Sequence, residues 1–411
     1  MSKIEKLIKE LCRDGVEYKK LYEITCWDKR FSGVEKSHQE KIVKFEHVSA
    51  EKLKTMQVKN GYVKLLSTGL FDGYTTEEIA GKYINNSTVI SFPTGGSANL
   101  KYYSGLFVDS GNILAISSNN ELYNLKFIFY NLKNKIKMIE SEYRGSGVKH
   151  PNMKNILMIK IPVPPLEVQE EIVRILDKFG ELEAELEAEL EARESQYEFW
   201  REKVFEFEKD YKSFKLEELF DLKNGYTPST GNKLFWNNGT IPWFRMEDIR
   251  ANGTILNNAI QHITPEALKK SGSFKANSII CATSATIGVH ALIKVDFLCN
   301  QRFTCMTLKE KYINEINMKY IHYYCFQLDA YCLNNLNQGN FCSVDMNTFK
   351  KFEFKIPSLQ EQERIVNILD KFDKLVNDIS EGLPAEIEAR RKQYEYYRNK
   401  LLSFEELIIN G

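Results

Sequence analysis

Four short loops carry the side chains with the greatest capacity for recognition chemistry. Thr94–Asn99 and Thr283–Gly288 each follow an apolar run, at an offset of 189 residues. Arg144–His150 and Gln338–Ser343 form a second pair. Backbone N–H and hydroxyl groups bind phosphate, Arg reaches guanine, and Asn or Gln reaches adenine. These residue types indicate contact with a nucleic acid; plain hairpin turns or solvated loops are the alternatives.

Two denser motifs, Tyr226–Thr230 and Ile241–Ile249, add to these loops. In the second motif, Trp243 and Phe244 are predicted core residues, which leaves Arg245 to reach outward. The nucleic-acid-binding candidates are small hydroxyl, amide and basic residues in or beside these segments. They are Ser97, Asn99, Lys101, Arg144, Lys149, Thr227, Ser229, Arg245, Thr283, Ser284, Thr286, Arg302, Gln338 and Asn340.

Signatures of catalysis are absent from the sequence. The chain contains no Gly-x-x-x-x-Gly-Lys-Ser/Thr loop, no Gly-x-Ser-x-Gly elbow, no His-Glu-x-x-His and no Asn/Asp-Pro-Pro-Tyr/Phe. The six histidines are scattered, and the eight cysteines include no Cys-x-x-Cys pair. Metal-ligand spacing is therefore missing as well. We expect no catalytic, cofactor-binding or metal-binding residues in this chain.

The elements that would position the loops occur twice. Met153–Phe179 aligns without a gap onto Met346–Phe372, and 12 of the 27 positions are identical. The match resumes at an offset of 197 residues, between Glu191–Lys203 and Glu388–Lys400. Two copies of a long unit indicate an internal pseudo-twofold rather than a solenoid.

Each copy ends in a helical segment, 166–208 in the first and 358–411 in the second. Three Glu-Leu-Glu-Ala tetrads fill 181–192 with strong helix formers, whereas Gly382-Leu-Pro384 predicts a kink or break in the second segment. Apolar residues at spacings of three and four form one stripe, which predicts a coiled coil or a buried partner face. The stripe consists of Ile172, Ile175, Leu176, Phe179, Leu182, Leu186 and Leu190, and of Ile365, Ile368, Leu369, Phe372, Leu375 and Ile379.

The remaining segments, 1–165 and 209–357, are rich in short Val, Ile, Phe and Tyr runs bounded by Gly, Asn and Ser. A helical stretch follows each set of runs, so the predicted class is α+β. The prediction is two similar globular domains joined by two long helices that pack as an antiparallel coiled coil.

A net charge of zero hides a division between the two kinds of segment. Segment 1–165 has 25 Lys and Arg against 17 Asp and Glu, a net charge of +8, and 209–357 has 18 against 13, a net charge of +5. Segment 166–208 has 5 against 15, a net charge of −10, and 358–411 has 8 against 11, a net charge of −3. Basic domains suit a polyanion, although this degree of charge is also ordinary.

Composition sets the broad class. The 411 residues are 43% hydrophobic, which suffices for real cores and excludes wholesale disorder. The weakly apolar stretch 277–294 contains Ser, Thr and His and predicts strands rather than a membrane span. The first ten residues lack the apolar core of a signal peptide, and the expected location is the cytoplasm.

The whole chain resembles, in order, the specificity subunit of type I restriction–modification enzymes. The resemblance rests on Pro164-Pro-Leu-Glu-Val-Gln-Glu-Glu-Ile-Val173 and its twin Pro357-Ser-Leu-Gln-Glu-Gln-Glu-Arg-Ile-Val366. The tetrads, Gly225-Tyr-Thr-Pro-Ser229 and Ile241–Ile249 add to it. The doubled architecture is more specific than any single motif.

The resemblance implies a division of labour. Residues 1–165 and 209–357 would be two target-recognition domains, each reading half of a split, asymmetric site in double-stranded DNA. The helical segments 166–208 and 358–411 would set the spacing and dock two methyltransferase subunits. Those partners would carry S-adenosylmethionine, and restriction and translocase subunits would carry ATP and Mg²⁺, so this chain would hold no cofactor.

Two other classes of function stay open on the sequence alone. One is a coiled-coil adaptor whose basic domains bind proteins rather than DNA. The other is an enzyme with a nuclease site too degenerate to recognise.

Overall fold

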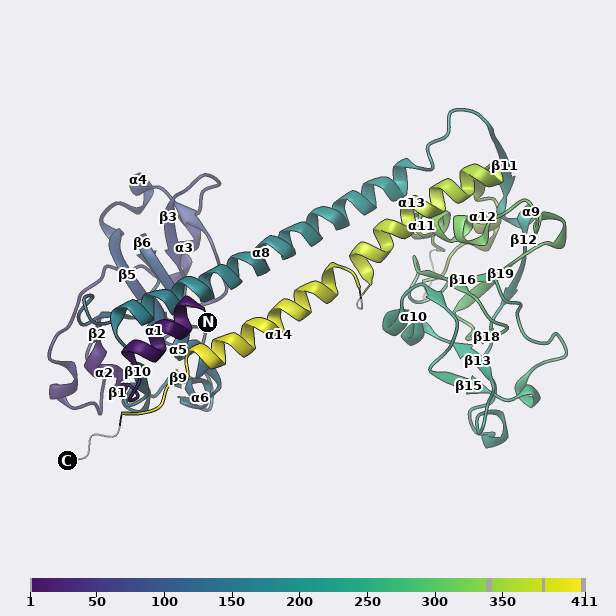
Figure 1. Cartoon of the computed structure of the whole chain (residues 1–411). Helices are drawn as coiled ribbons and strands as arrows, with labels where there is room; N and C mark the ends of the chain where they lie inside the picture. The colour runs from purple at the N-terminus through teal and green to yellow at the C-terminus, as the bar shows by residue number, and fades with distance from the viewer. Residues whose placement is uncertain (1, 338–341, 379–380, 408–411) are drawn as a thin grey trace. The chain divides into compact units, whose positions relative to one another are not determined.

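The computed structural model describes residues 2–337, 342–378 and 381–407. The chain forms two compact units. Unit 1 joins the chain up to Glu185 with the segment from Ile387 onward, and unit 2 comprises Leu186–Glu386. The long helix α8 (Leu166–Lys203) runs without a break from one unit into the other (Figure 1).

Unit 1 contains a globular α+β domain and parts of two long helices. Its helices are α1 (Lys3–Leu11), α2 (Leu21–Ile24), α3 (Ala50–Thr55), α4 (Glu77–Ala80), α5 (Leu125–Asn134), α6 (Ile136–Ser141), α7 (Met153–Ile156), the first part of α8, and most of α14 (Leu383–Leu401). Its strands are β1 (Glu17–Lys20), β2 (Thr25–Trp27), β3 (Val63–Leu66), β4 (Tyr74–Thr75), β5 (Asn85–Phe92), β6 (Lys101–Asp109), β7 (Ile113–Ser117), β8 (Tyr143–Arg144), β9 (His150–Pro151) and β10 (Lys160–Val163).

Unit 2 repeats this plan. Its helices are the rest of α8, α9 (Leu216–Leu219), α10 (Met246–Asn252), α11 (Met318–Asn334), α12 (Met346–Lys350) and α13 (Leu359–Asn377). Its strands are β11 (Tyr211–Lys215), β12 (Phe220–Asn224), β13 (Ile241–Phe244), β14 (Ile255–Leu256), β15 (Gln261–Ile263), β16 (Ser278–Ala282), β17 (His290–Ile293), β18 (Leu298–Cys299), β19 (Phe303–Leu308) and β20 (Glu353–Pro357).

The main sheets of the two units share one strand order over five strands, and unit 1 adds β4 at the edge. Unit 1 has the order β2-β7-β5-β6-β3-β4, and unit 2 has β12-β19-β16-β17-β14. In both sheets the central strands pair antiparallel, and β3 and β14 each join their neighbour in parallel. Unit 2 adds a small sheet, β15-β13-β18. The predicted α+β class with two similar domains is confirmed.

The root of each long helix is fixed by the same buried glutamine. In unit 1, Gln169 is 1% exposed, accepts from Asn124 N (2.9 Å) and donates to the carbonyls of Leu122 and Pro164. In unit 2, Gln362 accepts from Asn317 N (2.9 Å) and donates to Glu315 O and Pro357 O. Because a buried amide is costly unless it is bonded, this arrangement fixes the angle at which each helix leaves its domain.

A second shared contact lies about two turns further along each helix. Asp177 accepts from Lys126 Nζ (2.7 Å) and Tyr130 Oη (2.5 Å), and in unit 2 Asp370 accepts from the equivalent lysine and tyrosine. We call each Asp–Lys–Tyr set a helix latch: Asp177 with Lys126 and Tyr130, and Asp370 with Lys319 and Tyr323. The latches join the sheet-covering helices α5 and α11 to α8 and α13.

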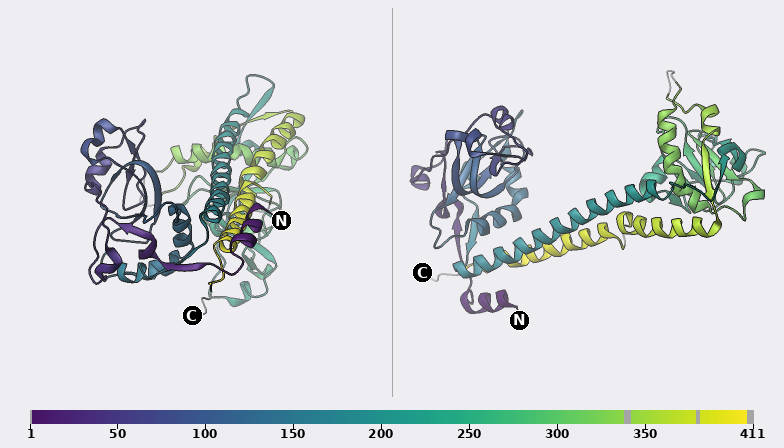
Figure 2. Two further views of the ribbon diagram at one scale, coloured as in Figure 1. Left: turned by 60° about the vertical axis from the view of Figure 1, so that its left-hand side comes forward. Right: turned by 90° about the horizontal axis from the view of Figure 1, so that it is seen from above.

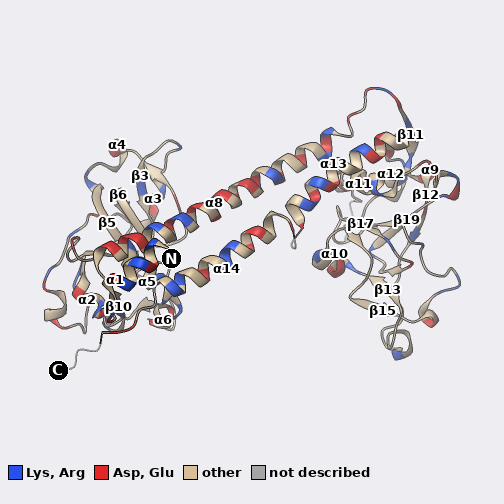
Figure 3. Cartoon of the chain, in the orientation of Figure 1, with Lys and Arg blue, Asp and Glu red and all other residues tan. Residues whose placement is uncertain are grey.

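The long helices pack antiparallel within each unit. In unit 1, Phe179 of α8 stacks on Tyr397 of α14 (ring centroids 5.6 Å apart), and Glu183 pairs with Arg391 (2.6 Å). In unit 2, Tyr197 of α8 stacks on Phe372 of α13 (6.2 Å). The predicted antiparallel coiled coil is therefore confirmed. Acidic side chains predominate along α8, with 13 Asp and Glu against 5 Lys and Arg, whereas α14 has 3 Glu against 5 Lys and Arg (Figure 3).

The second helical segment is interrupted where the sequence predicts a break. Helix α13 ends at Asn377, and α14 begins at Leu383 with a proline in its first turn. A Cβ on Gly382 would lie 2.6 Å from the carbonyl oxygens of Asp378 and Lys374, so only glycine fits there. The apolar stripe residues at the helix starts, Ile172, Leu176, Ile365 and Leu369, are fully buried. Ile379 lies outside the described residues.

Helix α1 covers the start of α8 in unit 1 (Figure 2). Ile4 packs with Val168, Ile172 and Leu176, and Lys3 Nζ lies 2.9 Å from Glu171 Oε2. The hydrogen bonds from Arg174 and then Lys3 lower the pKa of Glu171 to about 2, against the opposing effect of burial. The sequence did not predict this contact.

Glu171→Gln is expected to lower stability at pH 7 by about 1 kcal/mol, because both cationic partners are largely exposed. A carboxylate with a lowered pKa stabilises the folded state above its unfolded pKa and loses that contribution as pH falls towards 2. Melting temperatures of the two proteins should therefore begin to converge below about pH 5 and meet near pH 2. A gap that stays constant with pH would contradict this origin.

Candidate nucleic-acid interface

In unit 1, two of the predicted loops lie side by side. The loop Thr94–Asn99 connects β5 to β6, and the hairpin β8–β9 ends in the loop Gly145–Lys149. Gly96 N donates to Lys149 O (2.8 Å), and His150 Nδ1 lies 2.6 Å from Thr94 O. A Cβ on Gly95 would lie 2.8 Å from Cγ1 of the exposed Val148, so a larger residue there would displace that side chain. We call the two loops together recognition edge 1.

Recognition edge 1 frames an open hollow of about 510 Å³. Its lining includes Ser97 and Lys149 with Tyr143 and one acidic residue, Glu140. The Arg144 side chain is 65% exposed and lies 3.2 Å from Glu142, whose side chain is only 16% exposed and also accepts from Asn155 Nδ2 (2.8 Å). The edge therefore presents hydroxyl, amide, ammonium and guanidinium donors to the outside.

In unit 2, the equivalent loops meet at the equivalent place. Val344 N donates to Thr283 O (2.9 Å), and Ala285 N lies 3.3 Å from Cys342 O. Ala285 has φ 66°, a conformation that costs energy for a residue with a Cβ. We call Thr283–Thr286 with Cys342–Val344, Thr227 and Asn300–Arg302 recognition edge 2.

Thr227 and Arg302 enter edge 2 through hydrogen bonds. Thr283 N donates to Arg302 O (3.1 Å), and Thr227 Oγ1 donates to Gln301 Oε1 (2.6 Å). Gly225 allows the chain before Thr227 to lie close to Cys299 and Asn300, because a Cβ at Gly225 would lie 2.3 Å from their carbonyl oxygens. The Arg302 side chain is exposed. Gln301 was not predicted, and only its position beside an exposed arginine in a loop could have indicated it.

Two candidates are placed differently from their prediction. Lys101 donates to the carbonyls of Ser67 (2.7 Å) and Gly69 (2.6 Å), and burial lowers its pKa, so it ties two segments together. Arg245 caps α10 through its backbone and lies over the Trp243 ring, 5.4 Å from its centroid. Its Nε atom is buried, so Arg245 is held by the protein rather than reaching outward.

The remaining candidates lie at the end of recognition edge 1, away from edge 2 or outside the described part of the chain. Asn99 lines a different hollow, beside Lys64 and Asp72. Ser229 is exposed further along its loop, where its carbonyl accepts from Trp236 Nε1 (3.0 Å). Gln338 and Asn340 fall outside the described residues. Trp243 and Phe244 are buried, as predicted.

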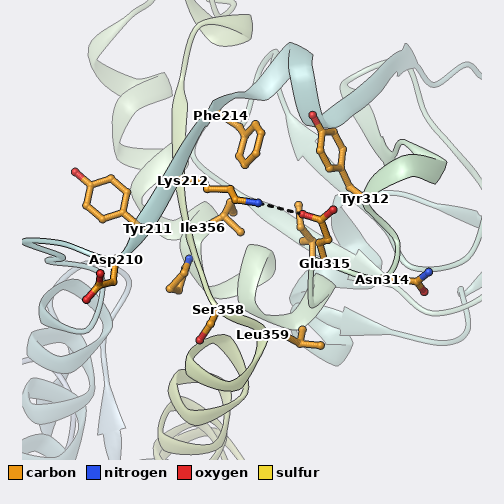
Figure 4. A pocket seen from close by; sticks show the side chains of 12 residues that line it. Asp210, Tyr211, Lys212, Phe214, Tyr312, Asn314, Glu315, Ile356, Ser358 and Leu359 are labelled. Carbon is orange, nitrogen blue, oxygen red and sulfur yellow. Dashed lines mark ion pairs between the residues drawn. The ribbon is translucent and has the colours of Figure 1, made fainter.

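A further hollow of about 500 Å³ lies where α13 begins in unit 2 (Figure 4). Aromatic residues Tyr211, Phe214 and Tyr312 line it, and Lys212 pairs with Glu315 across it (3.6 Å). None of its lining residues belongs to recognition edge 2. Among residues 2–337, 342–378 and 381–407, no group of histidine, cysteine and acidic residues could hold a metal ion, and no helix is long and apolar enough to cross a membrane.

Comparison with known proteins bears directly on this duplicated arrangement. The family model for the type I restriction modification DNA specificity domain matches twice, at residues 34–192 and 208–389. The chain belongs to that family. It is a DNA sequence-specificity subunit of the type I restriction–modification kind, and the adaptor alternative is not favoured.

Individual relatives agree with the assignment. The specificity subunit of the type I restriction enzyme EcoR124I/EcoR124II from Escherichia coli is 33% identical over 88% of this chain and 92% of its own. The EcoprrI specificity subunit from the same organism is 50% identical over 203 residues, about half of each chain (48% and 51%). The crystal structure of the type I S subunit from M. genitalium has a TM-score of 0.57 at 14% identity, covering 94% of this specificity subunit and 96% of its own chain, and so shows the same fold.

Proposed function

We propose that each globular domain of this specificity subunit reads one half of a bipartite, asymmetric DNA site. The observation that carries the proposal is the duplicated recognition edge. In each edge, one loop follows the equivalent sheet strand, β5 or β16. That loop is hydrogen-bonded to a second loop, which precedes the long helix of its unit. Different side chains on equivalent scaffolds would read different bases, because side-chain contacts to the base edges read the DNA sequence. Contacts to the DNA phosphate backbone only position the protein on the duplex.

The partners follow from the same division. We propose that the helical segments set the spacing between half-sites and dock two methyltransferase subunits, which carry S-adenosylmethionine. Restriction and translocase subunits would carry ATP and Mg²⁺, and the complex would act in the cytoplasm. This chain would contribute recognition and no catalytic group, in keeping with the absence of catalytic motifs from its sequence.

Methylome sequencing of a host that expresses the chain with its methyltransferase subunit tests the proposal. The expected result is adenine methylation at one split motif. A hybrid in which residues 209–357 come from another specificity subunit should change one half of that motif and keep the other. Methylation of an unsplit motif, or a change in both halves of the hybrid's motif, would contradict the assignment of one domain to one half-site.

Arg302→Ala is expected to weaken specific DNA binding by about 1–3 kcal/mol and relax one base position in the half-site read by unit 2. The side chain is exposed, while its backbone is held by Thr283. Fluorescence anisotropy with a panel of single-base variants of the site measures this. Lys270→Ala, an exposed basic residue outside edge 2, is the control. Equal weakening on every sequence would make Arg302 a phosphate contact instead.

A further inference from the structure

Two pairs of neighbouring aromatic residues are exposed on the long helices. Phe199 and Trp200 lie near the end of α8 in unit 2, and Tyr396 and Tyr397 near the end of α14 in unit 1. Their exposed fractions are 58% and 42%, and 62% and 36%. Single exposed apolar residues are ordinary, but two adjacent large aromatic side chains on a charged helix are not.

The two pairs occupy equivalent positions. Each follows the packing tyrosine of its helix, Tyr197 or Tyr394, by two and three residues, at the offset of 197 residues that relates the repeats. The rings make the same edge-on contact, with centroids 5.5 Å apart at 78° in the first pair and 5.4 Å apart at 76° in the second. The internal helix packing uses Tyr197 and Tyr394, and of the pair residues only Tyr397 joins it, through Phe179.

The charges around the two pairs differ. Residues 194–203 contain three acidic and two basic side chains, whereas 391–400 contain one acidic and four basic. A single partner surface cannot be electrostatically complementary to the charged residues around both pairs. The aromatic pair is therefore the feature that a common partner would recognise at both sites. Nucleic acid does not fit the first site, because segment 166–208 has a net charge of −10.

We infer that Phe199–Trp200 and Tyr396–Tyr397 are equivalent anchors for two copies of one protein partner, the methyltransferase subunit. Each copy would cover one pair with an apolar surface, since buried aromatic residues dominate the energy of protein interfaces. Two equal anchors on one chain give two copies of the partner without a second kind of interface. This inference rests on the proposed function, which supplies the identity of the partner, and adds the residues that hold it.

Native mass spectrometry of the full chain, co-expressed with the methyltransferase subunit of its own system, tests the inference. The wild type is expected to carry two copies. Phe199→Ser with Trp200→Ser, and Tyr396→Ser with Tyr397→Ser, should each leave one copy, and the fourfold variant none. The controls Glu198→Ser and Glu395→Ser, the equivalent exposed residues beside each pair, should keep two.

Further measurements distinguish a loss of partner binding from a loss of folding. Melting temperature and DNA binding of Phe199→Ser with Trp200→Ser, and of the single variants Phe199→Ser and Tyr396→Ser, should match the wild type. Because Tyr397 also stacks on Phe179, the single variants Phe199→Ser and Tyr396→Ser repeat the test on the more exposed ring, with at least tenfold weaker binding of one copy expected.

Two copies on both the wild type and the fourfold variant would overturn the anchors and leave the proposed function intact. No methyltransferase on the wild type would instead overturn the proposed docking itself. Self-association of the purified chain that the fourfold variant abolishes would assign the pairs to a second copy of this chain and overturn the inference.

Discussion

Insertion of one Glu-Leu-Glu-Ala tetrad within 181–192 of α8 is expected to lengthen the unread spacer of the DNA site and to leave both half-site sequences unchanged. Four helical residues add about 6 Å at roughly 1.5 Å per residue. DNA rises about 3.4 Å per base pair, so a change of about one to two base pairs follows. Deletion of one tetrad should shorten the spacer by a similar amount.

The expectation depends on the continuity of α8, which passes from unit 1 to unit 2 without a break. The tetrads contribute mostly exposed glutamates and alanines there, so an added tetrad changes length more than packing. Methylome sequencing of the insertion, deletion and parent strains measures spacer and half-sites together. New half-site bases with an unchanged spacer would show that the helix is no ruler.

Asp370→Ala is expected to destabilise unit 2 by about 2–4 kcal/mol. The substitution removes the acceptor for Lys319 Nζ (2.7 Å) and for the hydroxyl of Tyr323 (2.6 Å), a side chain that is 1% exposed. Folding removes a buried donor from water, and without an acceptor no hydrogen bond offsets the cost of that desolvation. Burial, the largest cause of the raised pKa of Tyr323, remains in the variant, so the hydroxyl stays protonated and keeps an unpaired donor.

Differential scanning calorimetry of the full chain measures this effect, with a drop in melting temperature of about 5–10 °C expected for the unit 2 transition. Asp177→Ala should lower the unit 1 transition in the same way. Glu363→Ala, exposed on the same helix as Asp370, is the matched control and should change little. Equal melting of Asp370→Ala and the control would contradict a stabilising latch.

Much of the architecture could be predicted because periodicity and repetition are local signals. The Glu-Leu-Glu-Ala tetrads and the Gly382-Leu-Pro384 break mark the long helices by spacing alone. The latch could also have been found, since Lys126, Tyr130 and Asp177 all have identical residues at an offset of 193. Polar residues that are identical in two otherwise diverged copies indicate that both copies form the same internal contact.

The details of the interface could not be predicted, because they depend on contacts between distant segments. Lys101 sits 34 residues from the carbonyl of Ser67 that holds it, and no pattern links the two. Arg245 was expected to reach outward, but the aromatic ring of Trp243 and the first turn of α10 retain it. The cover that α1 places on α8 has no counterpart in the second repeat for comparison.

The helix latch has an evolutionary consequence. In each unit the globular domain meets its long helix through the same hydrogen bonds. A glutamine on the helix accepts from a backbone N–H of the domain, and the latch aspartate accepts from a lysine and a tyrosine. A foreign domain that carries the latch lysine and tyrosine would pack on the unchanged helix. Recombination between related genes can thus replace one domain at a time, and each exchange would create a new DNA target from existing parts.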